Sequence, residues 1–173
     1  MKSMTRIFGI ILLSCLLFEM ANGADDNFKA DQTRIADAIE KIPASKIKLF
    51  LYSLDPHDAR RFSGKLPENS NKSFHYFPIL GRVEIVSTQE KTNLLGAFTK
   101  GIKENNESLA NCFDPRHGIR IVSETATNDF VICFECLQVQ AYGFNAGKYF
   151  LTSSSPNATF NKFLDEYHLK KAE

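Results

Sequence analysis

The chain has 173 residues, of which 43% are hydrophobic, and carries 21 basic and 20 acidic side chains for a net charge of +1. This length suits one ordinary domain, and the near-neutral charge excludes an electrostatic case for binding nucleic acid or an anionic membrane surface. Fifteen phenylalanines and no tryptophan indicate a packed aromatic core.

Residues 1–23 have the layout of a secretory signal peptide. Two basic side chains precede an apolar run that is too short to span a bilayer, and small residues lie just before a cleavage position after Gly23. We therefore expect one mature α+β domain over 24–173, with no transmembrane segment, exported to the periplasm or secreted. An uncleaved anchor and lipidation at Cys15 are the alternatives that this pattern favours less.

The first half of the mature chain alternates helix and strand patterns. Apolar residues at helical spacing predict a helix over 31–42, which Pro43 ends. Alternation predicts a strand over 46–52. The polar residues 67–73 predict a loop, and a second strand is expected over 82–87.

The second half is predicted to hold two helices and three strands. Thr92 can cap the first of these helices, and Ser155-Pro156 begins the second. The three strands are expected at 118–123, 130–142 and 148–152, with a polar turn at 124–129. The order α-β-β-α-β-β-β-α favours an α+β fold, in which helices pack on a mostly antiparallel sheet of about five strands.

Seven chemically active side chains fall on the hairpin expected after residue 111. They are Cys112, Arg116, His117, Arg120, Cys133, Glu135 and Cys136. If the turn is centred near Ala126–Thr127, position 117 lies opposite 135 or 136. All three cysteines could then come within reach of His117.

The cysteines have three interpretations. In an oxidising compartment a disulfide is expected, from Cys112 to Cys133 or Cys136. The last two should not bond to each other, since residues three apart in a regular strand face opposite sides. A zinc site of three cysteines and His117 has matching ligand types. Buried cysteines without special chemistry are the third interpretation. A redox dithiol of the thioredoxin type is favoured less, because Cys-Phe-Glu-Cys falls inside a predicted strand and not at a helix N-terminus.

Glu135 is predicted to lie inside an apolar strand, where a carboxylate is costly unless it is paired. Its expected partners across the hairpin are Arg116, His117 and Arg120. A Glu–His acid/base pair beside a nucleophilic thiol is the functional alternative. His75, which lies beside two aromatic residues, is interpreted as a packing residue.

The sequence holds no nucleotide-binding, nucleophile-elbow or zinc-protease motif. It therefore favours a binding or interaction module for a protein or a small ligand, centred on a disulfide-linked hairpin. The alternative is a metal-binding or Cys/His-dependent enzyme that uses the residues Cys112, His117, Cys133, Glu135 and Cys136, with zinc as the candidate metal.

Four blocks, at 51–56, 78–81, 112–120 and 131–136, carry a resemblance. The third contains Cys-Phe-Asp-Pro-Arg-His-Gly and the fourth reads Val-Ile-Cys-Phe-Glu-Cys. In these blocks the chain resembles a family of uncharacterised exported bacterial proteins, over roughly residues 46–142. The resemblance implies a bacterial envelope or secreted setting, and it implies no activity.

Overall fold

A computed structural model describes residues 31–57, 69–105, 110–143 and 148–172. The expected signal peptide at 1–23 lies outside these residues. Residues 31–40 are helical. The other elements are η1 (Ala44–Lys46), β1 (Lys48–Leu54), β2 (Ser73–Phe74), β3 (Phe77–Ile85), α3 (Thr88–Lys103), β4 (His117–Val122), β5 (Thr127–Cys133), β6 (Gln138–Tyr142), β7 (Lys148–Leu151) and α4 (Asn157–Glu166).

The strands form one seven-stranded sheet in the order β2-β3-β1-β4-β5-β6-β7. Each neighbouring pair is antiparallel, so the α+β class is confirmed. The expected number of about five strands was too low, for two reasons. A turn at 134–137 divides the predicted strand 130–142 into β5 and β6, and β2 forms at the end of the predicted loop 67–73, where no strand was expected.

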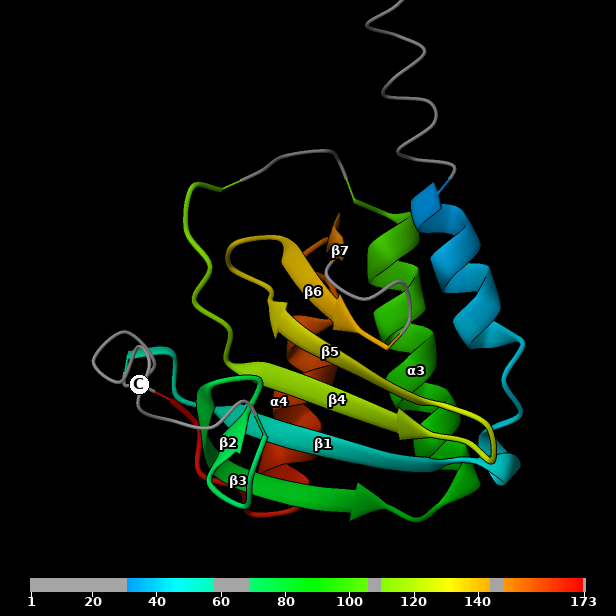
Figure 1. The fold of residues 1–173 in the computed structure, drawn as a ribbon, viewed down its shortest axis with the longest axis horizontal. Coiled ribbons are helices and arrows are strands. Elements are labelled where there is room, and N and C mark those ends of the chain that lie inside the picture. Colours follow the sequence, from blue (N-terminus) through cyan, green and yellow to red (C-terminus); the bar gives the residue numbers. More distant parts are fainter. Residues whose placement is uncertain (1–30, 58–68, 106–109, 144–147, 173) are drawn as a thin grey trace, which may run out of the picture.

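Helices cover one face of this sheet, with α4 behind β1 and β4 and with α3 beside the helix of residues 31–40 (Figure 1). Lys103 at the end of α3 holds the two neighbouring helices together, because its Nζ lies 2.8 Å from both Asp37 and Glu40. None of the helices in the described ranges is long and apolar enough to cross a membrane.

The core on the helical side is aromatic. Phe98 of α3 packs against Phe130 of β5 with ring centroids 5.2 Å apart, and Phe150 and Phe160 complete the group. All four side chains are buried. The aromatic core that the composition predicted is therefore present where the helices meet the sheet.

The start of α3 differs from the sequence expectation. The hydroxyl of Ser87 accepts a hydrogen bond from the backbone N–H of Glu90, so Ser87 and not Thr92 is the N-cap. The helix therefore gains an extra turn at its N-terminus. The apolar stripe predicted on this helix is nevertheless the face that it buries.

The β2–β3 hairpin covers part of the other sheet face. Phe74 stacks on Tyr52, with ring centroids 4.1 Å apart, and both side chains are buried. Gly118 allows this close approach, because a Cβ atom there would lie 2.7 Å from the Phe74 ring. The hairpin also brings His75 over the middle of the sheet.

Candidate functional site

The β4–β5 hairpin closes earlier than the sequence suggested. The backbone N–H of Ser123 donates to the carbonyl of Ala126, and His117 lies opposite Ile132. The predicted pairing of position 117 with 135 or 136 was therefore wrong. Thr127, Asn128 and Asp129, which were assigned to a polar turn, are extended residues of β5.

The disulfide joins Cys133 to Cys136. The expected bond to Cys112 was wrong, as was the exclusion of a bond between the two strand cysteines. The reason is local: β5 ends at Cys133, and the following residues turn, with Leu137 in the left-handed region at φ 57°. Cys112 is a free and exposed cysteine, and its Sγ lies 3.5 Å from that of Cys136.

The zinc set considered as an alternative from the sequence is not assembled among the described residues. Two of its sulfurs are joined in the disulfide, and the Nε2 atom of His117 contacts Asn161 of α4. Among the described residues, no group of three or more histidine, cysteine, aspartate or glutamate side chains could hold a metal ion.

Glu135 lies at the surface and not inside a strand. It belongs to the turn between β5 and β6, and its side chain is 66% exposed. Its Oε2 atom accepts a hydrogen bond of 2.7 Å from Nη1 of Arg116. The expected pairing with Arg116 is therefore present, but the expected burial was wrong. Arg120 pairs instead with Asp129.

His117 is a buried member of the predicted cluster, with 4% of its surface exposed. Its Nε2 lies 3.1 Å from Oδ1 of Asn161, and the Nδ2 of Asn161 donates to Asn157. Because an amide oxygen only accepts, the proton lies on Nε2 of the imidazole. Burial lowers the pKa of His117 to about 4, against the opposing effect of the Asn161 hydrogen bond. The imidazole is therefore neutral at neutral pH.

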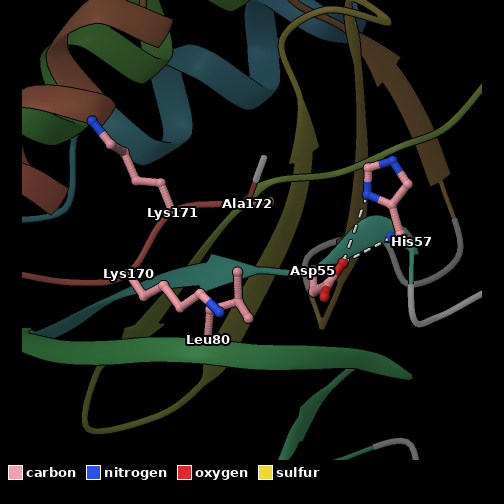
Figure 2. A pocket seen from close by; sticks show the side chains of 6 residues that line it. All are labelled: Asp55, His57, Leu80, Lys170, Lys171 and Ala172. Carbon is pink, nitrogen blue, oxygen red and sulfur yellow. Dashed lines mark hydrogen bonds and ion pairs between the residues drawn. The ribbon is translucent and has the colours of Figure 1, made fainter.

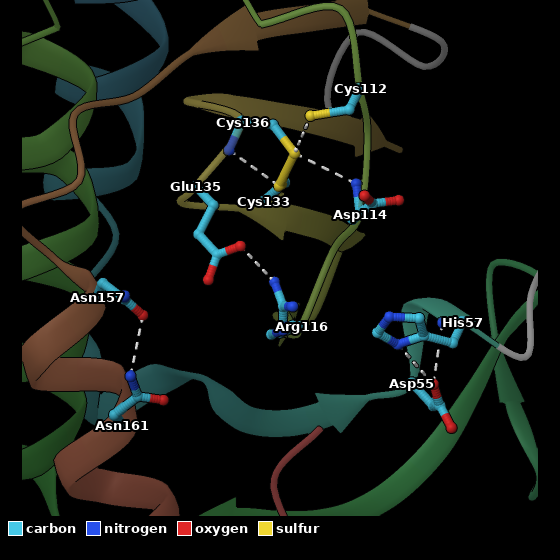
Figure 3. A network of polar contacts seen from close by, with 10 residues as sticks. All are labelled: Asp55, His57, Cys112, Asp114, Arg116, Cys133, Glu135, Cys136, Asn157 and Asn161. Atoms are coloured by element: carbon cyan, nitrogen blue, oxygen red, sulfur yellow. Dashed lines mark hydrogen bonds and ion pairs between the residues drawn. A yellow bond between two sulfur atoms is a disulfide. The ribbon is translucent and has the colours of Figure 1, made fainter. Parts of the chain in front are cut away.

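A cavity of about 290 Å³ lies beside His117. In Figure 3, Arg116 and Glu135 face Asn157 and Asn161 across this region. Ser53 of β1 also lines the cavity, and its buried hydroxyl has no hydrogen-bond partner among the described residues. The remaining lining residues are Leu164, Lys171 and Ala172.

A second hollow, of about 410 Å³, lies beside the C-terminal segment, which contributes Lys170, Lys171 and Ala172 to its lining (Figure 2). Asp55 and His57 line it, and the Asp55 carboxylate accepts from the backbone N–H of His57. Lys171 and Ala172 line both hollows. No buried polar atom that lacks a partner in the described part of the chain lines this second one.

Sequence reasoning missed a buried charge network on the opposite sheet face. Nε2 of His75 lies 2.7 Å from the carboxylate of Asp129, which Arg120 also contacts. The His75 ring stacks on Tyr142 with centroids 3.5 Å apart. Burial acts to raise the pKa of Asp129, but the hydrogen bonds from Arg120 and His75 outweigh it and hold the pKa below its usual value.

The only local signal for this network was an aspartate before an apolar run, which is typical of a turn. His75 and Asp129 are 54 positions apart. The fold brings them together, and no spacing rule within one element could have predicted the contact.

Comparisons with known proteins add little to this geometry. No family model matches the chain, and no curated protein matches it. Among solved structures, the chain is similar to "Putative Lipoprotein from Clostridium perfringens", at 17% identity and a TM-score of 0.39, over 76% of this chain and 90% of that one. A TM-score at this level does not establish a shared fold. The resemblance to exported bacterial proteins therefore stays a prediction.

Proposed function

We propose that this protein is an exported binding domain whose ligand site is the cavity beside His117. The observation that carries the proposal is the hydroxyl of Ser53, which is buried, lines the cavity and lacks a partner within the described residues. A buried polar group without a hydrogen bond is costly. Because Ser53 is 0% exposed, the lining side chains must shift for a ligand to reach this hydroxyl, supply the bond and recover that free energy.

The lining favours a small ligand that carries an anionic group. Arg116 and Lys171 bring two cations to the rim, and the amides of Asn157 and Asn161 add hydrogen-bonding groups. Each cation is also paired with a carboxylate, Arg116 with Glu135 at 2.7 Å and Lys171 with Asp165 at 2.6 Å, so an anionic ligand would compete with these partners. With about 290 Å³, the cavity lies just below the usual range for ligand sites, which begins at about 300 Å³.

A protein partner has less support. Within the described residues, the exposed large hydrophobic side chains are Tyr76, Val86 and Tyr149. Val86 follows β3, whereas Tyr76 lies in a hairpin turn and Tyr149 in β7. Tyr149 packs on Phe113, which packs on Phe77. The proposal rests on the cavity because a buried polar atom without a partner in the described residues lines it.

A Cys/His-dependent enzyme also has less support. Nucleophilic catalysis needs a base within hydrogen-bond reach of the nucleophile. His117 instead donates to Asn161, and the cysteine cluster contacts other groups. The alternative therefore lacks its expected nucleophile–base pair in this arrangement.

The proposal is tested by NMR titration of the folded protein with acetate and with inorganic phosphate. We expect saturable shifts at the backbone amide of Ser53 and the side-chain amide of Asn161. Ser53→Ala should raise the Kd by up to about tenfold, the worth of one hydrogen bond. Lys171→Gln should also weaken binding.

Lys162→Gln is the matched control for the lysine substitution. It removes the same charge from an exposed side chain of α4 that does not line the cavity. The proposal would be overturned if the shifts do not saturate with either anion. It would also be overturned if the Lys171 and Lys162 substitutions have equal effects on the Kd and Ser53→Ala has none.

A further inference from the structure

We propose that Cys112, Cys133 and Cys136 form a thiol–disulfide exchange site, in which exposed Cys112 connects external thiols to the buried Cys133–Cys136 bond. This chemistry is separate from the cavity beside His117. The central observation is the distance of 3.5 Å between Sγ of Cys112 and Sγ of Cys136. A disulfide needs about 2.05 Å, so a shift of roughly 1.5 Å would bring the two sulfurs to bonding distance.

Three hydrogen bonds hold the Cys112 segment against the β5–β6 turn. The side-chain amide of Gln138 donates to the carbonyls of Ala110 and Cys112, at 2.6 and 3.2 Å. The backbone N–H of Asp114 donates to Sγ of Cys136 at 3.2 Å. The short distance between the sulfurs is therefore built into the fold at both ends of the segment.

The arrangement also suits the sulfur that would leave. The backbone N–H of Cys136 donates to Sγ of Cys133 at 3.0 Å. When the Cys133–Cys136 bond breaks, this N–H is already aimed at the sulfur that takes up the negative charge. Hydrogen bonds to a thiolate stabilise it and make it a better leaving group.

The order of the three sulfurs fits a displacement. In Figure 3 the sulfur of Cys136 lies between those of Cys112 and Cys133. A thiolate displaces a disulfide sulfur from the side away from the bond that breaks. Attack by Cys112 on Cys136 would therefore expel Cys133, whose leaving position carries the N–H contact.

Exposure decides which cysteine meets an external thiol. Cys133 and Cys136 are each 1% exposed, whereas Cys112 is exposed. A thiol the size of glutathione can reach Cys112 directly, and it can reach the buried disulfide only after an opening of the structure. External thiols therefore react with the Cys133–Cys136 disulfide by way of Cys112.

The exchange balances in three steps. The Cys112 thiolate attacks Sγ of Cys136, a Cys112–Cys136 bond forms, and Cys133 leaves as a thiolate that takes a proton from water. An external thiolate then attacks Sγ of Cys112 and releases Cys136. A second external thiolate attacks the mixed disulfide, giving the external disulfide and free Cys112. The pair gains two electrons, which the two external thiols supply.

The first experiment measures how fast glutathione reduces the disulfide in the folded protein, by acid quench, alkylation and mass spectrometry. Cys112→Ser keeps the Cys133–Cys136 bond and should slow reduction by at least about tenfold, because the intramolecular attack is lost. Asn111→Ser changes the neighbouring exposed residue, keeps all three sulfurs, and should react at the wild-type rate. Equal rates for wild type and Cys112→Ser would overturn the proposal.

The second experiment traps the exchanged bond. Cys133→Ser leaves only Cys112 and Cys136, which should form a disulfide in a glutathione redox buffer, seen by peptide mapping. Two thiols that stay separate or take up only glutathione, in a protein that remains folded by circular dichroism, would overturn the proposal. If this variant does not fold, the Cys112→Ser rate decides, since that variant retains the native bond.

Discussion

Arg120 of β4 and Asp129 of β5 are direct partners in the sheet register and make a two-point ion pair. Nε of Arg120 lies 2.7 Å from Oδ1 of the carboxylate, and Nη2 lies 2.7 Å from Oδ2. The guanidinium also lies over the Phe74 ring, 5.3 Å from its centroid. With His75 on the same carboxylate, the pair joins the β2–β3 hairpin to the centre of the sheet.

We predict that Asp129→Ala strongly destabilises the protein. The substitution leaves Arg120 and the buried His75 without their shared acceptor, and breaking a buried pair costs about 3–5 kcal/mol. Urea unfolding measures the loss. Glu124→Ala, at an exposed position of the same hairpin, is the control and should change the free energy of unfolding by less than about 0.5 kcal/mol. Similar small effects for both would mean that the network does not support the fold.

The buried neutral imidazole of His117 predicts a specific pH dependence of stability. Its pKa is about 4 in the folded state, against an ordinary value of 6.5, so the unfolded chain binds the proton more readily between these values. The contribution of the neutral His117 to the free energy of unfolding is fully present above the ordinary pKa of 6.5. It is lost as the pH falls from 6.5 to 4. The loss should reach roughly 3 kcal/mol.

This dependence is measured by urea unfolding of wild type and His117→Gln across that pH range. The variant lacks the titrating group, so its free energy of unfolding should fall less as the solution is acidified. A wild-type and a variant curve that run parallel from pH 6.5 to 4 would show that His117 is not buried as a neutral side chain.

Two glycines of α3 should respond oppositely to alanine. Gly96 is exposed and has open space where a Cβ atom would lie, so Gly96→Ala should stabilise by about 0.5–1 kcal/mol through helix propensity. A Cβ at Gly101 would collide with Pro156 and lie 2.7 Å from Oγ1 of Thr152. Gly101→Ala should therefore destabilise by about 1–3 kcal/mol despite the same propensity gain.

Thermal unfolding followed by circular dichroism compares these two variants directly. The melting temperature should rise for Gly96→Ala and fall for Gly101→Ala. A rise for both would mean that the approach of Pro156 to α3 is looser than the structure has it.

Glu135→Ala should have little effect on stability. Because the side chain is mostly exposed, its ion pair with Arg116 is expected to contribute about 0–1 kcal/mol. Chemical denaturation of the variant at low and high salt checks this, and the small loss should vanish at high salt. A loss of several kcal/mol would instead restore the interior ion pair expected from the sequence.

The sequence predicted the type of most elements because their apolar patterns are strong. The stripe of α3 and the alternation before Asp55 are examples, and both elements are present. The errors fall where a local break changes the pattern. In the run from 130 to 142, Leu137 adopts a positive φ and turns the chain, although its residue type gives no sign of a turn.

The sequence predicted several residues of the candidate site, but it did not predict how they are arranged. Arg116 and Glu135 do pair, but the cysteine bonding followed from treating 133 and 136 as residues of one regular strand. The cavity beside His117 depends on Ser53 and Asn161, which come from β1 and α4. Residues so far apart are brought together only by packing of the helix on the sheet.

The strand order also bears on how the protein behaves at high concentration. One border strand, β2, has two residues and the other, β7, has four. The longer β3 extends beyond the two residues that β2 pairs with, and it carries Arg82 and Glu84 there. Short border strands and charged side chains both make a sheet edge a poor template for a strand from another molecule. The sheet is thereby protected against edge-to-edge association into larger β-structured aggregates.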